Sequence, residues 1–275
     1  MQLGRKTLKS SKARTKKIDA TFERAAYAML VCYALFTCVV FISRNDAIRV
    51  DNIRAVGMNA ASKEDILKLA ADGLNTKILY WLRRDNALLY PKETLHTKIL
   101  ALDSHIESVD IAIEKKQLAI SVHEYTPKYL WCRNSLTSTS TSDCYFANER
   151  GYIYASAPQY TGNAFITYKT LIDGVDEKTS PIKSEMLSSD TRERVEAFID
   201  ALKKTNITPM LIEQTGKNDF TFKVNRPWAI SWSTTQAPDR AIENLRLLLA
   251  STGDINASTT LSSIDLRFDG KIFYK

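Results

Sequence analysis

The chain has 275 residues, 44% of them apolar and 25% charged, enough for one large or two small domains besides short appendages. These proportions are ordinary for a globular protein and exclude a wholly disordered, collagen-like or polytopic membrane chain. The net charge is +7, and residues 1–24 carry eight bases against two acids, a local charge of +6. The other 251 residues therefore sum to only +1, so the charge of the body does not indicate nucleic-acid binding.

The basic tail is followed by eighteen uncharged residues, Ala25–Ile42, of which only Thr37 is clearly polar. A helix of that length spans about 27 Å, just enough for a bilayer core. A cleaved signal peptide is the alternative, but its apolar region is shorter and ends in small residues, whereas Phe41-Ile42-Ser43-Arg44 stands here. The sequence therefore predicts an uncleaved transmembrane helix over 25–43.

The charges around this helix set its expected orientation. Eight bases precede it, and Arg44, Arg49 and Arg54 follow it closely. Because the more basic flank stays in the cytoplasm, residues 1–24 are expected inside and about 230 residues outside the plasma membrane. Anionic lipid head groups can attract the tail, and a nucleic-acid-binding tail is the alternative interpretation.

The first exported module, residues 47–124, opens with a strand and a helix. The strand runs over 47–56 and is closed by Gly57, and Ser62 can cap the helix, which ends near Gly73. The stretch after this helix, 74–89, is irregular but apolar. It includes three large apolar side chains, Tyr80, Trp81 and Leu82.

A second helix and a hairpin complete this module. The helix begins after Pro91, and alternating runs before and after Lys115-Lys116 predict a β-hairpin with one buried face. The order is therefore β-α-α-β-β, in which helices on one face of a three-stranded sheet suffice for a small core.

The second exported module, residues 125–275, is expected to be a mixed β-rich domain with two helices. Strands at 129–132 and 144–146 flank a Ser/Thr run, 135–142, which is expected as a solvated loop. The helices are expected over 190–204 and 239–250. Further strands are expected at 152–154, 207–213, 220–224, 228–232, 261–268 and 271–275. The predicted fold class is α+β, with the two modules following a single transmembrane helix.

The four cysteines form two groups. Cys32 and Cys38 lie in the apolar stretch and are most simply small apolar residues. Cys132 and Cys144 lie in the exported part, where a disulfide can persist, and pairing of the strands around them would bring their sulfurs close. No CxxC motif occurs and the three histidines show no ligand spacing, so no metal site is expected.

Motifs of nucleotide binding and of hydrolytic catalysis are absent from the sequence. His123-Glu124 beside Tyr125 could suggest acid–base work, but His123 alternates with an apolar residue and is expected to face solvent. Asp265 and Arg267 lie two residues apart on one strand and are expected to form a surface ion pair rather than an anion site. The sequence therefore predicts no enzyme, no cofactor and no small-molecule substrate.

Four short motifs follow one another over nearly the whole chain. They are Ile53-Arg54-Ala55-Val56-Gly57, Val122-His123-Glu124-Tyr125-Thr126-Pro127 with Trp131 after it, Asn148-Glu149-Arg150-Gly151-Tyr152-Ile153, and Ile264-Asp265-Leu266-Arg267-Phe268. In this order, behind a basic tail and one anchor, they resemble the FtsQ/DivIB family of bacterial cell-division proteins, whose small β-α-α-β-β module is the POTRA domain. The stretch 74–89 is longer than the link between POTRA helices in that family.

The resemblance implies a non-enzymatic scaffold of the division septum, which binds FtsB- or DivIC-type and FtsL-type partners and helps to regulate septal peptidoglycan synthesis. It implies recruitment through the POTRA domain. A POTRA-bearing envelope secretion or assembly component is the alternative, and a membrane-anchored hydrolase is the enzyme alternative.

The resemblance also points to the C-terminal hairpin as the partner-binding surface. The candidate residues are Leu266, Arg267, Phe268, Gly270, Lys271, Ile272, Phe273 and Tyr274. A chain-terminal strand is often a sheet edge that can accept a strand from another protein. With a two-residue turn at Asp269-Gly270, Phe268 would share a side with Leu266 and Phe273. Arg267 would then share the other side with Ile272 and Tyr274.

Overall fold

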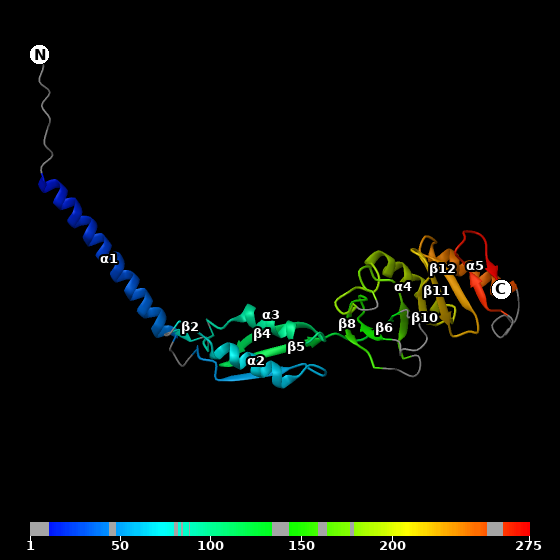
Figure 1. The fold of residues 1–275 in the computed structure, drawn as a ribbon, viewed down its shortest axis with the longest axis horizontal. Coiled ribbons are helices and arrows are strands. Elements are labelled where there is room, and N and C mark those ends of the chain that lie inside the picture. Colours follow the sequence, from blue (N-terminus) through cyan, green and yellow to red (C-terminus); the bar gives the residue numbers. More distant parts are fainter. Residues whose placement is uncertain are drawn as a thin grey trace, which may run out of the picture. The chain divides into compact units, whose positions relative to one another are not determined.

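The computed structural model describes residues 11–43, 48–79, 82–83, 85–87, 89–133, 143–158, 164–176, 179–251 and 261–275. Over these residues the protein is mixed α+β, with five helices and a sheet-rich body (Figure 1). The chain forms two compact units. Unit 1 comprises Met1–Asp103 and Ser108–His123, and unit 2 comprises Ser104–Glu107 and Glu124–Lys275.

Helix α1, Ser11–Ser43, contains the predicted apolar segment. Its stretch Glu23–Phe41 has 19 residues with a mean hydropathy of 1.8, and none of that stretch is buried. By length and composition this helix could span a membrane. Large side chains such as Tyr27, Leu30 and Phe41 are exposed, as a lipid-facing helix requires.

The sheet of unit 1 has three strands, β1 (Asn52–Val56), β4 (Ile106–Glu114) and β5 (Gln117–Glu124), in the order β1-β5-β4. Strand β1 is parallel to β5. Lys115 and Lys116 join β4 to β5 with φ angles of 47° and 66°, the left-handed pair that a tight hairpin turn of type I′ needs. The predicted hairpin is thus confirmed.

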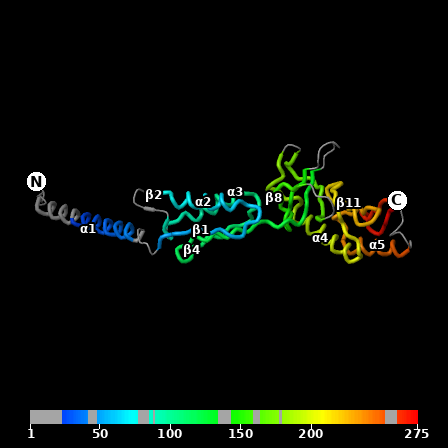
Figure 2. The backbone as a smooth tube through the Cα atoms, turned by 90° about the horizontal axis from the view of Figure 1, so that it is seen from below, coloured from blue at the N-terminus to red at the C-terminus, as the bar shows by residue number. Residues whose placement is uncertain are grey.

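Two helices, α2 (Lys63–Asn75) and α3 (Lys92–Leu102), lie together on one face of this sheet (Figure 2). The Ser62 hydroxyl accepts a hydrogen bond from the Asp65 amide at 3.3 Å, which confirms the predicted N-cap. Helix α2 ends at Asn75, two residues beyond Gly73, near the predicted end. A Cβ at Gly73 would approach the Leu95 side chain of α3 at 2.7 Å. The glycine therefore lets the two helices pack closely.

A hairpin that the sequence did not predict lies between these helices. Strands β2 (Lys77–Leu79) and β3 (Leu82–Arg83) pair antiparallel and form a two-stranded sheet of their own. Strands of two or three residues are too short for a recognisable alternation of apolar and polar positions. The prediction that the stretch 74–89 is irregular is therefore wrong for these two strands.

Unit 2 contains a nine-stranded sheet in the order β14-β13-β12-β11-β10-β9-β6-β7-β8. The strands are β6 (Tyr129–Cys132), β7 (Cys144–Ala147), β8 (Ile153–Ser156), β9 (Ile166–Lys169), β10 (Pro209–Gln214), β11 (Asp219–Val224), β12 (Ala229–Ser233), β13 (Ser263–Asp265) and β14 (Phe273–Tyr274). Of these, β9 was not predicted.

The two helices of unit 2 connect parallel strands. Helix α4 (Ser189–Lys203) joins β9 to its parallel neighbour β10. Helix α5 (Pro238–Ser251) joins β12 to its parallel neighbour β13. The side chains of Phe198 on α4 and Ile242 and Leu245 on α5 belong to one buried core with the sheet. Both predicted helices are confirmed to within a residue at each end.

Strands β6 and β7 place Cys132 opposite Cys144, and a disulfide joins the two. The predicted Ser/Thr loop, 135–142, lies outside the described residues. Cys32 and Cys38 are free thiols on α1.

Removing this disulfide should destabilise unit 2. The two cysteines are 12 residues apart, and closing a loop of that size stabilises by about 3 kcal/mol in the chain-entropy model. We expect the double variant Cys132→Ala/Cys144→Ala to lose about that free energy of unfolding in urea titrations of the full chain in detergent. The control Cys32→Ala/Cys38→Ala should keep the stability of unit 2. Equal stability of both double variants would contradict the assignment.

Gly57 should tolerate no side chain. It follows β1 with φ +88°, and a Cβ would overlap the backbone carbonyl of Val122. We expect Gly57→Ala to cost more than the roughly 1–2 kcal/mol of the left-handed conformation alone. Gly174→Ala is the matched control, because Gly174 has φ +79° and no atom lies within 4 Å of an added Cβ. Equal losses of unfolding free energy in the two variants would refute the steric argument.

Candidate partner-binding surface

The C-terminal hairpin forms one end of the nine-stranded sheet. Strand β13 pairs in parallel with β12, and β14 pairs antiparallel with β13 as the outermost strand. The turn between them closes where the Lys271 amide donates to the Phe268 carbonyl at 3.4 Å. Gly270 has φ +67° in this turn, with no atom within 4 Å of an added Cβ.

The predicted pairing register of this hairpin is wrong by one residue, so the predicted assignment of side chains to its two faces is wrong as well. A regular ladder from a two-residue turn would pair Leu266 with Phe273, but Phe273 pairs with Asp265 and Tyr274 with Ile264. Phe273 therefore lies on the face of Asp265 rather than that of Leu266, and Tyr274 does not share the side of Arg267. The strands are also shorter than the predicted 261–268 and 271–275.

Two hydrogen bonds explain this shift. The Leu266 amide donates to the Ser231 carbonyl of β12 at 2.8 Å, and the Arg267 amide donates to the Asp265 side chain at 3.0 Å. Both amides thus have partners away from β14, so the ladder with β14 ends at Asp265. A side chain that captures a nearby backbone amide competes with sheet pairing in this way.

Two apolar side chains fix the hairpin to the body of unit 2. Ile264 is 0% exposed and Leu266 is 3% exposed, and both belong to the core. Ile272 packs partly against the same core. Leu266 and Ile272 therefore hold the hairpin in place instead of offering their side chains to a partner.

Arg267 forms an ion cluster on the other face of β13. Its Nε and Nη2 donate to the Asp265 carboxylate at 2.9 Å and 2.6 Å, and Nη1 lies 3.6 Å from Oδ2 of Asp219 on β11. The ion pair between Asp265 and Arg267 confirms the sequence interpretation. Hydrogen bonding from Arg267 lowers the pKa of Asp265, and the same contact raises the pKa of Arg267.

Three aromatic side chains of the hairpin are exposed. Phe268 is 49% exposed, Phe273 54% and Tyr274 58%. The rings of Phe268 and Phe273 meet edge to face at 5.5 Å, and the Arg267 guanidinium lies 5.8 Å from the Phe268 ring centre. Phe268 is thus not part of the core. Clustered exposed aromatic side chains are typical of a protein–protein contact.

The two ends of the sheet differ in how their edges are covered. At the β8 end the chain itself covers the start of the edge strand, since Ile153 exchanges backbone hydrogen bonds with Lys183 and Ser184 at 2.8 Å and 2.9 Å. At the other end, no strand among the described residues pairs with the outer side of β14. Lys271, beside the turn, is exposed. The uncovered edge is therefore the one that carries the aromatic side chains.

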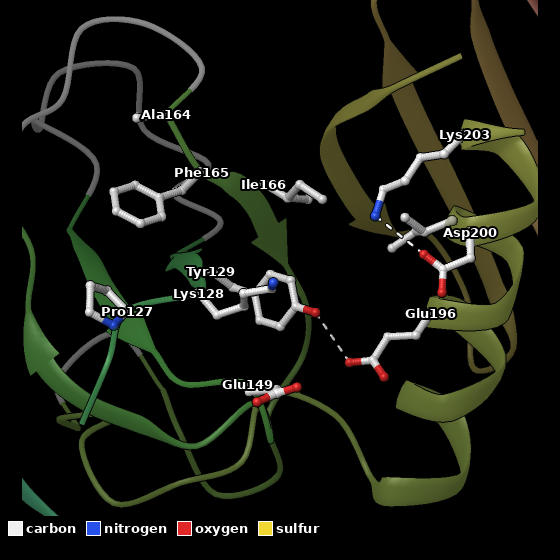
Figure 3. Close-up of a pocket in the computed structure, with 11 residues that line it drawn as sticks. Pro127, Lys128, Tyr129, Glu149, Ala164, Phe165, Ile166, Glu196, Asp200 and Lys203 are labelled. Carbon is white, nitrogen blue, oxygen red and sulfur yellow. Dashed lines mark hydrogen bonds and ion pairs between the residues drawn. The ribbon is translucent and has the colours of Figure 1, made fainter. Parts of the chain in front are cut away.

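A pocket of about 510 Å³ lies elsewhere in unit 2, between α4 and the starts of β6 and β9 (Figure 3). The Tyr129 hydroxyl donates to Glu196 at 3.2 Å, and Glu196 also pairs with Arg192 at 3.0 Å. Burial, with the neighbouring Glu196 carboxylate, raises the pKa of Tyr129, so its hydroxyl stays protonated. Asp200 pairs with Lys203 at 3.2 Å. Glu196, Asp200 and Lys203 are thus held by partners within the wall of the pocket, which Lys128 and Glu149 also line.

Tyr129 and Glu196 are 67 residues apart in the sequence, so no local motif could have indicated their contact. His123, by contrast, lies where the sequence predicted, exposed on β5 and 3.6 Å from Asp110. Among the described residues no cluster of three or more His, Cys, Asp or Glu side chains could hold a metal ion.

No family model matches the chain, and no curated protein matches its sequence. The likeness to the FtsQ/DivIB family therefore rests on the four motifs and on the order of the elements.

Lowering the pH should weaken the ion pair between Asp265 and Arg267 and so reduce the stability that it gives to the hairpin. The pKa of Asp265 in the folded protein lies below the unfolded value of about 3.9. The contribution of its carboxylate to the free energy of unfolding is therefore complete above that pH. The contribution is lost as the pH falls through the lowered pKa. We expect the stability difference between the wild type and Asp265→Asn to be constant near neutral pH and to shrink below about pH 4.

Urea titrations of both proteins from pH 7 to pH 3 measure this difference. Asp173→Asn, at an exposed position outside the cluster, is the control and should change stability little at any pH. A pH-independent difference for Asp265→Asn would contradict the assignment of the lowered pKa to the Arg267 contact.

Proposed function

We propose that the protein is a single-pass scaffold of the bacterial division machinery, of the FtsQ/DivIB type. In this role it links recruitment to the division site with septal peptidoglycan synthesis by binding FtsB- or DivIC-type and FtsL-type membrane proteins. The observation that carries the proposal is the uncovered edge strand β14 with Phe268, Phe273 and Tyr274 exposed around it. The function is binding, without catalysis or a cofactor.

The membrane arrangement in this proposal follows from the sequence. The basic tail remains in the cytoplasm, α1 crosses the plasma membrane, and both compact units lie outside it. The order β1, α2, α3, β4, β5 in unit 1 is that of the β-α-α-β-β POTRA module, with β2 and β3 inserted between its helices. This unit would take part in recruitment to the septum.

The partner adds a strand to β14. Backbone hydrogen bonds along the edge would supply affinity, and side chains on alternate positions would supply specificity. Phe268 and Phe273 form the apolar part of the contact, and Tyr274 adds an aromatic ring with a polar tip. Lys271 offers a positive charge beside the turn, and Gly270 permits the left-handed backbone that the turn requires.

Loss of the aromatic contact should weaken partner binding. We expect Phe268→Ala to cost about 2 kcal/mol or more in a titration with the extracytoplasmic segment of the cognate FtsB-type protein, about 30-fold in Kd. Deletion of residues 271–275 should weaken binding further, because it removes β14 itself.

The matched control is Leu171→Ala, which shortens an apolar side chain that is also exposed but lies outside the hairpin. It should leave the affinity unchanged. Unfolding of unit 1 is followed in the same proteins to show that the module stays intact. Unchanged affinity in both hairpin variants would place the partner site elsewhere.

A further inference from the structure

The pocket of about 510 Å³ in unit 2 has the size of sites that hold small molecules, which measure about 300–1,000 Å³ (Figure 3). Helix α4 forms one wall, and the segments that lead into β6 and β9 form the other. Every lining residue that the structure describes belongs to unit 2 and lies outside the C-terminal hairpin. The pocket is therefore a feature separate from the strand edge of the proposed function.

The lining of this pocket changes from apolar at its base to charged at its mouth. Tyr129 and Ile199 are only 7% and 3% exposed, and Ile166 beside them is half-buried, so these three form the base. The charged residues of the mouth are exposed, and they are Lys128, Glu149, Asp200 and Lys203. An apolar base with a few polar groups around it is typical of sites for small organic ligands.

A contact across the base fixes the two walls. The Tyr129 hydroxyl donates to Oε1 of Glu196 at 3.2 Å, which joins β6 to α4 (Figure 3). Oε2 of Glu196 pairs with Arg192 at 3.0 Å. Both oxygens of this carboxylate thus have partners, and the walls are held in place without a ligand. A preformed site does not lose binding free energy in ordering its own walls.

Backbone hydrogen bonds hold the mouth on the strand side. The Asn148 side chain accepts a hydrogen bond from the Arg150 amide at 3.0 Å, which fixes the turn that carries Glu149. The Lys128 amide donates to the Ala147 carbonyl at 2.9 Å. Lys128 and Glu149 are therefore carried by two neighbouring segments that are bonded to each other.

The charges of the pocket cancel in pairs except for two. Glu196 is already paired within α4, and Asp200 pairs with Lys203 at 3.2 Å. No ion pair or side-chain hydrogen bond joins Lys128 or Glu149 to another residue that the structure describes. A ligand with one charge would be attracted by one of these two groups and repelled by the other. A zwitterion meets both with the opposite charge.

We propose that this pocket binds the zwitterion of an α-amino acid with an apolar side chain. The ammonium group of the ligand pairs with Glu149, and its carboxylate pairs with Lys128. The apolar side chain enters the base beside Ile166 and Ile199. The ion pairs form at an exposed mouth, where each contributes little, so we expect a Kd on the order of 1 mM.

Methyl NMR of the isoleucine-labelled full chain in lipid nanodiscs measures binding at the site itself. L-Phenylalanine is the probe. Its addition should shift the methyl signals of Ile166 and Ile199 and leave that of Ile230, which is fully buried outside the pocket, unchanged. Glycine has the same charges without an apolar side chain, so it should bind about tenfold or more weakly.

Two derivatives of the probe test the charges of the mouth, at about pH 6, where α-amino groups are protonated. L-Phenylalanine amide lacks the carboxylate and N-acetyl-L-phenylalanine lacks the ammonium group, and each should bind about fivefold more weakly than phenylalanine. In Lys128→Ala the amide and phenylalanine should bind alike, and in Glu149→Ala the acetylated form and phenylalanine should do so. Lys223→Ala, at an exposed position outside the pocket, is the control and should keep both differences.

Two results would overturn the proposal. The first is that the Ile166 and Ile199 signals do not shift up to the solubility limit of phenylalanine. The second is that phenylalanine, its amide and its acetylated form bind alike to the unaltered chain, because the pocket would then bind apolar surface without using Lys128 and Glu149.

Discussion

Stacking of Phe198 on Trp232 is the interaction on which the C-terminal end of the sheet depends. The two rings lie 4.4 Å apart with only 3° between their planes, and both are fully buried. The contact fastens α4 to β12, the strand that precedes the C-terminal hairpin in the sheet. Truncating a buried aromatic side chain of this kind costs about 3–5 kcal/mol, a large part of the roughly 5–15 kcal/mol by which native proteins are stable. Without β12 in place, β13 has no partner for its parallel ladder and Ile264 has no core to enter.

The terminal hairpin therefore combines a rigid base with an open edge. Ile264 and Leu266 are buried, while Arg267 is held by carboxylates of β13 and β11. The aromatic side chains beyond them remain exposed. Because the base is fixed, a partner strand would meet a preformed edge and would not need to order the hairpin first, which preserves binding free energy. At the opposite edge, Lys183 and Ser184 bond to the backbone of Ile153 in β8, whereas no strand among the described residues pairs with the outer side of β14.

The sequence predicted those parts of the fold whose signals are local. Each of these signals involves residues that are close in the sequence. They are the alternation around Lys115-Lys116, the Ser62 cap and the apolar faces of α4 and α5, and the structure confirms the hairpin, the cap and both helices. Strand β9 was missed because its partners β6 and β10 are parallel and distant in the chain. The register of the hairpin was missed because it depends on where two amides of Leu266 and Arg267 find acceptors. Which hairpin residues are exposed and which are buried also follows from tertiary packing alone.

Backbone hydrogen exchange along β14 tests the central claim most directly. Amide exchange is compared in the full chain with and without the extracytoplasmic segment of the cognate FtsB-type partner. If a partner strand adds to the open edge, the amides of β14 and its flanking residues become protected, while those of β8 at the other edge do not change. Protection confined to other parts of the protein, with exchange of the β14 amides unchanged, would contradict strand addition at this edge.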